Sequence, residues 1–488
     1  MILKKCVEIC FLVIAFLVLS LGALGYAQDS PSLPPGLERS HPDDDDIPSL
    51  PPGLSEEETP QLPEGLDTPK ITEKDISTPQ PQEPLVNIIG FGEIRGGVRL
   101  WDDRYEKRES LGEGRLQLEI DRSWTRMGFK ITGDFIYDPV LDRHRISLND
   151  GEGWFDLREA FVFFTPLEFS DVKIGRQIMT WGTGDLLFIN DLFPKDWNSF
   201  FIGRDVEYLK SSSDALRVTL FNDYANIDLY YSPEFDADRY VDGKRVSYWN
   251  IMERRRAGRD RIIRPEQRSQ WFTDDETGGR LFKNLRGYEL AAYWYIGFWK
   301  SPAGTDMHKN RANFPALNVY GASIRSRVLG GIGNLEFGYY DSKEDRGGDD
   351  PFVRNSEVRL LIGFDEEVKK DFTVGLQYYL EHMQHYNSYR RTLPRSMRTQ
   401  DLNRHVITVR LTQLLLKQDL TLSLFMYWSP SDSDCYFRPN IKYKISDNLI
   451  VEAGGNIFAG RHDYTFFGQF EKNSDIYFSI RKYFVFLN

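Results

Sequence analysis

The chain has 488 residues, of which 41% are hydrophobic and 14% aromatic, and it carries a net charge of −12 at neutral pH. Its 3 cysteines are too few for a disulfide framework. No nucleic-acid partner is expected.

The first 27 residues have the features of a secretory signal peptide. Lys4 and Lys5 precede a 14-residue apolar run at 11–24, and small residues follow it at 25–27. The run is shorter than the roughly 20 residues that cross a bilayer, so we expect cleavage rather than a membrane anchor. Cleavage would leave Cys435 as the single cysteine of the mature chain.

Residues 28–85 form a separate segment that holds 13 of the 24 prolines, 14 acidic residues and 3 basic ones. Such a composition cannot bury enough apolar surface to fold, so we expect disorder. The segment repeats "PSLPPGL" at 31 and 48 and "PQLPEGL" at 60. The repeats are either a spacer or proline-rich ligands for a periplasmic partner. Most of the acidity lies here, because residues 86–488 carry a net charge of only −2.

From 86 to 488 apolar residues recur at every second position, for example in "LQLEI" (116–120) and "LTLSLFMYW" (420–428). This is the period of β-strands. Short connections between the predicted strands alternate with long polar connections, as in bacterial outer-membrane barrels. We therefore predict an all-β, transmembrane, antiparallel up-and-down barrel of about 18 strands, with 16 possible. The count would be 16 without the pair around "GGRLFKN" and "YELAAYWYIG". The expected location is the outer membrane of a Gram-negative bacterium.

Three stretches carry a family resemblance: "DLREAFVFF" (156–164), "KIGRQIMTWGTGDLLFINDLFPKDW" (173–197) and "DALRVTLF" (214–221). They resemble a porin-like group within the superfamily of phosphate-selective porins and alginate exporters. The resemblance implies an outer-membrane barrel that passes solutes, without naming the solute. Barrels of this kind usually end on an aromatic residue that the outer-membrane assembly machinery recognises. We expect Phe484 or Phe486 to be that residue here.

Arg176 interrupts an otherwise apolar face. Folding the hairpin 154–179 about a turn between Leu167 and Glu168 places Glu159 opposite Arg176, where opposite charges stabilise a strand pair. We therefore predict a structural pair of Glu159 and Arg176 rather than a substrate contact.

The segment 180–212 is rich in both aromatic residues and aspartates, so neither water nor a dry core suits it. A wide barrel lumen offers an apolar wall as well as water, so we expect this loop to fold inward and to narrow the pore. The residues expected at the constriction are Trp181, Asp185, Asp191, Asp196 and Trp197.

Two arginine-rich stretches, at 254–268 and 389–398, are expected in external loops. They either contact the phosphates of lipopolysaccharide or form a funnel that attracts anions. The arginines singled out are Arg254, Arg255, Arg256, Arg259, Arg390 and Arg391.

No catalytic motif is apparent, and no cofactor is expected. "HMQH" (382–385) suggests a metal site, but residues three apart on a strand point to opposite faces. The leading hypothesis is a channel for small anionic solutes. The alternatives are an exit duct for an anionic exopolysaccharide and a non-conducting scaffold that acts through the proline-rich tail.

Overall fold

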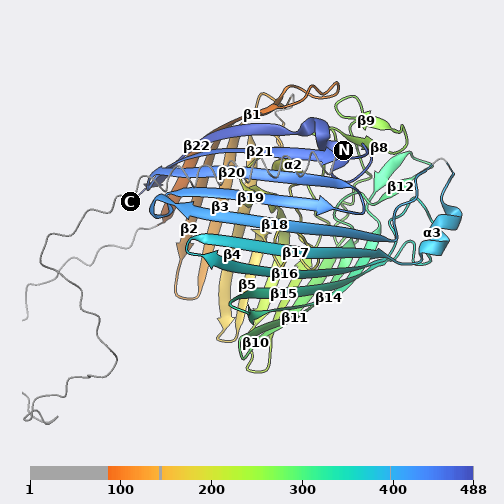
Figure 1. Cartoon of the computed structure of the whole chain (residues 1–488). Helices are drawn as coiled ribbons and strands as arrows, with labels where there is room; N and C mark the ends of the chain where they lie inside the picture. The colour runs from red at the N-terminus through yellow and green to blue at the C-terminus, as the bar shows by residue number, and fades with distance from the viewer. Residues whose placement is uncertain (1–85, 142–144, 396, 487–488) are drawn as a thin grey trace, which may run out of the picture. The chain divides into compact units, whose positions relative to one another are not determined.

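A computed structural model describes residues 86–141, 145–395 and 397–486. The predicted signal peptide at 1–27 and the predicted disordered segment at 28–85 lie outside these residues. The described chain folds into one closed antiparallel sheet of 18 strands (Figure 1). Closure occurs where β1 (Asn87–Arg99) pairs with both β2 (Glu109–Ser123) and β22 (Asp475–Phe486).

The other fifteen barrel strands follow in chain order, each paired with its neighbours. They are β3 (Met127–Tyr137), β4 (Phe155–Leu167), β5 (Ser170–Ile178), β6 (Ser212–Leu220), β7 (Asn226–Ser232), β10 (Glu276–Leu285), β11 (Tyr288–Phe298), β14 (Ala316–Val328), β15 (Gly331–Ser342), β16 (Glu357–Lys369), β17 (Phe372–Met383), β18 (Asn403–Leu415), β19 (Leu420–Ser429), β20 (Asp434–Ser446) and β21 (Leu449–Gly460). The predicted number of 18 strands is confirmed. The pair predicted around "GGRLFKN" and "YELAAYWYIG" forms as β10 and β11.

Short and long connections lie at opposite ends of the barrel. The short ones include residues 286–287, 329–330 and 447–448, and the long ones include 179–211 and 233–275. Small elements within the long connections are α2 (Trp197–Phe201), η1 (Val206–Leu209), β8 (Tyr248–Asn250), β9 (Arg255–Ala257), β12 (Gly304–Asp306), β13 (Arg311–Asn313), α3 (Tyr386–Thr392) and η3 (Gly468–Asn473); η2 (Leu416–Gln418) is part of a short turn. Figure 1 shows β8, β9, β12 and α3 gathered at one end.

The two faces of the sheet have the reverse of the polarity found in a water-soluble protein. In β1, Ile94 is 75% exposed, whereas Glu93 and Arg95 on either side of it are 5% and 2% exposed. Leu116 of β2 is exposed and its neighbour Arg115 is buried. Apolar side chains therefore cover the outside, and charged ones line the inside.

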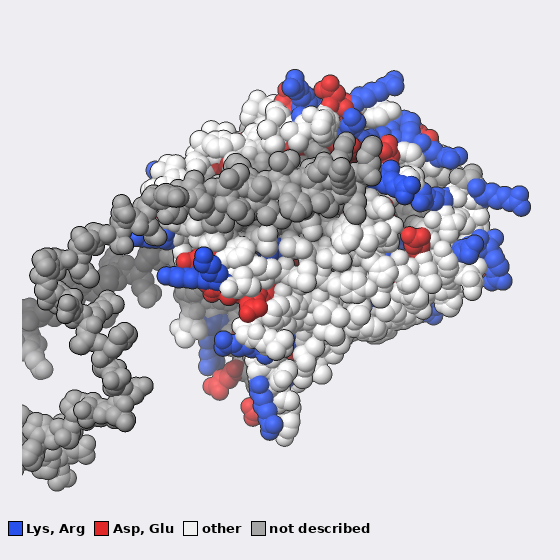
Figure 2. All heavy atoms as spheres, viewed as in Figure 1, with Lys and Arg blue, Asp and Glu red and all other residues white. Residues whose placement is uncertain are grey.

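This polarity suits a barrel whose outer face meets lipid and whose inner face meets water and other polar groups. Figure 2 shows charged side chains gathered toward the two ends of the barrel, with a wide uncharged surface between them. No helix among the described residues is long and apolar enough to span a membrane.

Candidate functional site

The connection 179–211, between β5 and β6, enters the lumen and crosses to the far wall. Asp185 forms an ion pair of 2.5 Å with Arg410 of β18. The hydroxyl of Tyr427 in β19 donates to the carbonyl oxygen of Leu186 over 2.8 Å. The Arg95 guanidinium of β1 donates to the carbonyl oxygen of Gly203 over 2.6 Å. Because β5 pairs only with β4 and β6, these contacts confirm the predicted in-folded loop.

Glu336 of β15 holds the first part of the loop. Its carboxylate accepts hydrogen bonds from the backbone amides of Thr183, Gly184 and Asn190, the last two over 2.8 and 3.3 Å. The side-chain amide of Asn190 adds a fourth bond of 3.1 Å. Glu336 is only 1% exposed, so these four donors replace the water that an ionised carboxylate would otherwise need.

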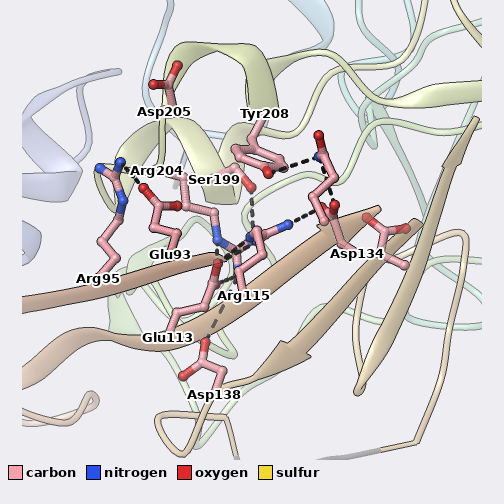
Figure 3. Close-up of polar contacts among 12 residues, drawn as sticks. Glu93, Arg95, Glu113, Arg115, Asp134, Asp138, Ser199, Arg204, Asp205 and Tyr208 are labelled. Atoms are coloured by element: carbon pink, nitrogen blue, oxygen red, sulfur yellow. Dashed lines mark hydrogen bonds and ion pairs between the residues drawn. The ribbon is translucent and has the colours of Figure 1, made fainter. Parts of the chain in front are cut away.

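Glu113 of β2 holds the last part of the loop (Figure 3). Its carboxylate pairs with Arg115 on its own strand at 2.5 Å and with Arg204 of the loop at 2.6 Å. Arg115 also pairs with Asp134 of β3. The Tyr208 ring of η1 lies over Arg115, with 4.1 Å between the guanidinium carbon and the ring centroid. The loop therefore supplies one cation and one aromatic face to a charged cluster on the wall.

Asp205 extends this attachment to β20 and β22. It lies 3.4 Å from Lys442 and 3.9 Å from Arg481. Arg481 also pairs with Glu93 at 3.3 Å and with Glu207 of the loop at 2.8 Å. Ion pairs from the loop thus reach strands on both sides of the closure between β22 and β1.

An aromatic cluster fills the space between the loop and the wall. Phe201 of α2 lies 4.8 Å from Phe470 and 5.6 Å from Phe458, measured between ring centroids. Asp196 caps α2 by accepting a 2.7 Å hydrogen bond from the Ser199 amide. The cap fixes the direction of the short helix and thereby places its phenylalanines against the wall.

Most of the predicted constriction residues form ion pairs or hydrogen bonds with other residues of the protein. Asp191 pairs with Lys195 at 2.9 Å. The Trp181 indole donates to Asp228 over 3.1 Å, and the Trp197 indole donates to Asp238 over 3.2 Å. Of the three predicted aspartates, only Asp185 pairs with a cation on the lumen wall.

The predicted pair of Glu159 and Arg176 is wrong. The hairpin closes with Leu167 opposite Ser170, later in the chain than predicted, and a register shift between Phe164 and Leu167 follows, so that Ala160 lies opposite Arg176. A slip of one residue exchanges the faces that side chains share. Arg176 pairs instead with Asp214 at 2.9 Å, and Glu159 pairs with Lys130 at 3.1 Å.

Two of the predicted external arginines join different loops: Arg256 lies 3.6 Å from Asp463, and Arg259 pairs with Glu106 at 3.1 Å. Arg255 pairs with Asp260 at 2.8 Å within its own loop. Arg254, Arg390 and Arg391 are exposed. Burial raises the pKa of Glu106 to about 7, although Arg99 and Arg259 beside it oppose the shift.

A row of three cations lies on β5, β6 and β10, toward the end of the barrel that has the short turns. Its members are Lys173, Arg217 and Arg280. Lys173 of β5 sits directly opposite Arg217 of β6, a like-charge arrangement that destabilises a strand pair. Arg217 pairs with Asp228 at 2.8 Å, and Arg280 lies 3.6 Å from the same carboxylate. The ammonium group of Lys173 forms no ion pair or hydrogen bond with another described residue, and it lies 4.0 Å from the centroid of the Phe161 ring.

Sequence reasoning missed Glu336, Glu113 and the cation row. Each is a charged residue within an alternating strand, and alternation shows which face a residue occupies without showing what it contacts. Among the described residues, no group of three or more His, Cys, Asp or Glu side chains is placed to hold a metal ion.

A family described as a protein of unknown function (DUF1302) matches residues 111–267. No curated protein matches the chain. Among solved structures, OccAB4 of Acinetobacter baumannii is similar at 9% identity and a TM-score of 0.50, covering 83% of this chain and 99% of its own. OccK3 (OpdO) of Pseudomonas aeruginosa has 10% identity, a TM-score of 0.49, and coverage of 82% and 96%. A mutant of the Rh. blastica porin has 10% identity, a TM-score of 0.37, and coverage of 82% and 100%.

The likeness to OccAB4 concerns the fold, and it agrees with the closed sheet and the apolar exterior described above. The chain has the fold of an outer-membrane β-barrel, with a long loop inside the lumen.

Replacing Glu336 with alanine should loosen the loop. The substitution leaves three backbone amides without their acceptor, and each unsatisfied buried group costs about 1–3 kcal/mol. We expect faster hydrogen exchange at Thr183, Gly184 and Asn190 and a lower melting temperature in detergent. Glu289→Ala, at an exposed acid of β11, is the control. Unchanged exchange at all three amides would show that Glu336 does not hold the loop.

Glu106 should make the stability of the connection 100–108, between β1 and β2, depend on pH. Because its pKa in the folded protein is raised, Glu106 contributes stability at acidic pH that is lost as the pH rises toward and through about 7. The melting temperature of the wild type should therefore fall between pH 5 and pH 8, by more than that of Glu106→Gln. Glu109→Gln, at an exposed acid nearby, should behave as the wild type does. Equal pH dependence in all three proteins would contradict the assignment.

Proposed function

We propose that this protein is an outer-membrane channel for small anionic solutes, with the loop 179–211 as its constriction. The observation that carries the proposal is the position of the loop, which crosses a closed 18-stranded barrel and is attached to both of its sides. A barrel of this width has room for an aqueous channel. A fixed loop within it would set the size of the solutes that pass.

The preference for anions rests on the cation row. Like charges face each other at Lys173 and Arg217, and Lys173 has no carboxylate among the described residues within ion-pair distance. An arrangement that costs stability is well explained by the binding of an anion from solution, which would relieve the repulsion. The exposed Arg254, Arg390 and Arg391 would either attract anions to the mouth or contact lipopolysaccharide.

An exit duct for an anionic exopolysaccharide is the second candidate. The motifs at 156–164, 173–197 and 214–221, which resemble phosphate-selective porins and alginate exporters, support it, and all three lie within the range of the family match. A polymer needs a wider passage than a small solute does. The many attachments of the loop therefore favour the small-solute channel.

Recording in planar bilayers tests the proposal. Deleting 184–200 should raise the single-channel current, because the deletion removes the segment that reaches β18. Replacing Lys173 and Arg217 with glutamine should lower the anion preference in the reversal potential, most strongly at low salt, where charges are least screened. Lys369→Gln with Lys370→Gln, at a short turn, is the control. Silence of both the wild type and the deletion variant would support the non-conducting scaffold instead.

The external arginines need a separate variant. If Arg254, Arg390 and Arg391 form a funnel, glutamine at all three should lower the anion preference at low salt and leave the current at high salt unchanged. If the reversal potential stays the same while lipopolysaccharide binding weakens, these arginines contact lipid and not solute.

A further inference from the structure

A groove lies on the lipid-facing side of the barrel, away from the loop. It runs over β22, β1, β2 and β3 and has a volume of about 760 Å³. Its lining is mostly apolar and includes Leu116, Phe135, Trp154 and Ile480, each of them at least 40% exposed. Cavities of roughly 300–1,000 Å³ are large enough to hold a small organic molecule.

Glycines make the floor of the groove. Gly92 lies opposite Leu116, and Gly114 lies opposite Ile94. A Cβ atom added at Gly92 or Gly114 would meet no atom within 4 Å. Bare backbone at these two positions, beside the protruding Ile94, leaves a depression in a surface that apolar side chains otherwise cover.

One cation stands at the short-turn side of this groove. Lys482 lines it, lies opposite Gly92 and precedes the end of β22 by four residues. It is exposed, and its ammonium group forms no ion pair or hydrogen bond with another described residue. A lysine on the lipid face of a barrel is unfavourable away from the interface, so a negatively charged partner from the membrane would stabilise it.

We propose that this groove binds one glycerophospholipid, with an acyl chain along Gly92 and Gly114 and the phosphate at Lys482. Arg115 and Glu93 also border the groove, but both are buried, so Lys482 is the one exposed cation among the residues that line it. An apolar channel with one exposed cation at its end matches an amphiphile that has one anionic head. A second copy of the barrel fits less well, because 12 residues line the groove, against roughly 20–30 per side in a stable protein interface. The proposal depends on the barrel lying in a membrane and is independent of conduction.

Native mass spectrometry of the detergent-purified barrel, with added phosphatidylglycerol or phosphatidylethanolamine, tests the site. The wild type should retain one phospholipid as detergent is increased. Gly92→Leu with Gly114→Leu places apolar side chains in the groove, at positions where an added Cβ atom meets nothing within 4 Å, and should abolish this retention. Lys482→Gln should weaken it several-fold while the acyl site remains. Ala322→Leu, at an exposed alanine of β14, and Lys283→Gln are the matched controls and should bind as the wild type does.

The same samples separate the other outcomes. If every variant retains the same amount of lipid, the lipid binds the barrel surface nonspecifically and the groove is not a lipid-binding site. If the glycine variant changes the oligomeric state in size-exclusion chromatography without changing lipid retention, the groove is an interface between copies. Either result would overturn the proposal. Equal melting temperatures for the variants and the wild type would exclude misfolding as the cause of lost binding.

Discussion

The ion pairs between the loop 179–211 and the barrel wall are the interactions on which the rest of the structure depends. A closed barrel with an apolar exterior has to turn its charged side chains inward, and buried charges need partners. Glu113 and Glu336 are both almost completely buried. Glu336 accepts hydrogen bonds from loop amides, and Glu113 forms an ion pair with Arg204 of the loop. Removing one member of such a pair leaves a buried charge and typically costs about 3–5 kcal/mol.

This dependence explains why the loop is long and of mixed composition. Its aspartates and arginine meet charges on β2, β18, β20 and β22. Its phenylalanines pack against aromatic residues near the long-loop end of the wall. The attachments at the two parts of the loop hold the segment across the lumen.

The strands could be predicted from the sequence because alternation has a period of two and recurs along the chain from 86 to 488. The in-folded loop could also be predicted, since aromatic residues and aspartates together fit only a lumen. The partner of Arg176 could not be, because the turn lies between Leu167 and Ser170 and a register irregularity follows it. Together they displace the pairing by one residue, and no residue pattern indicates either. Glu336 and Glu113 looked like ordinary inward-facing residues. Their partners lie more than 90 positions away in the chain and meet them only in the folded barrel.

Cross-linking in intact membranes tests the central claim that the loop is attached to the far wall. The variant carries Asp185→Cys with Arg410→Cys in a Cys435→Ser background. A short bifunctional thiol reagent should join the two cysteines, because Oδ2 of Asp185 lies 2.5 Å from Nε of Arg410 in the native protein. Asp185→Cys with Val162→Cys, a residue on the outside of β4, should not be joined. Failure of the first pair to cross-link, with both cysteines reactive toward a monofunctional reagent, would contradict the account.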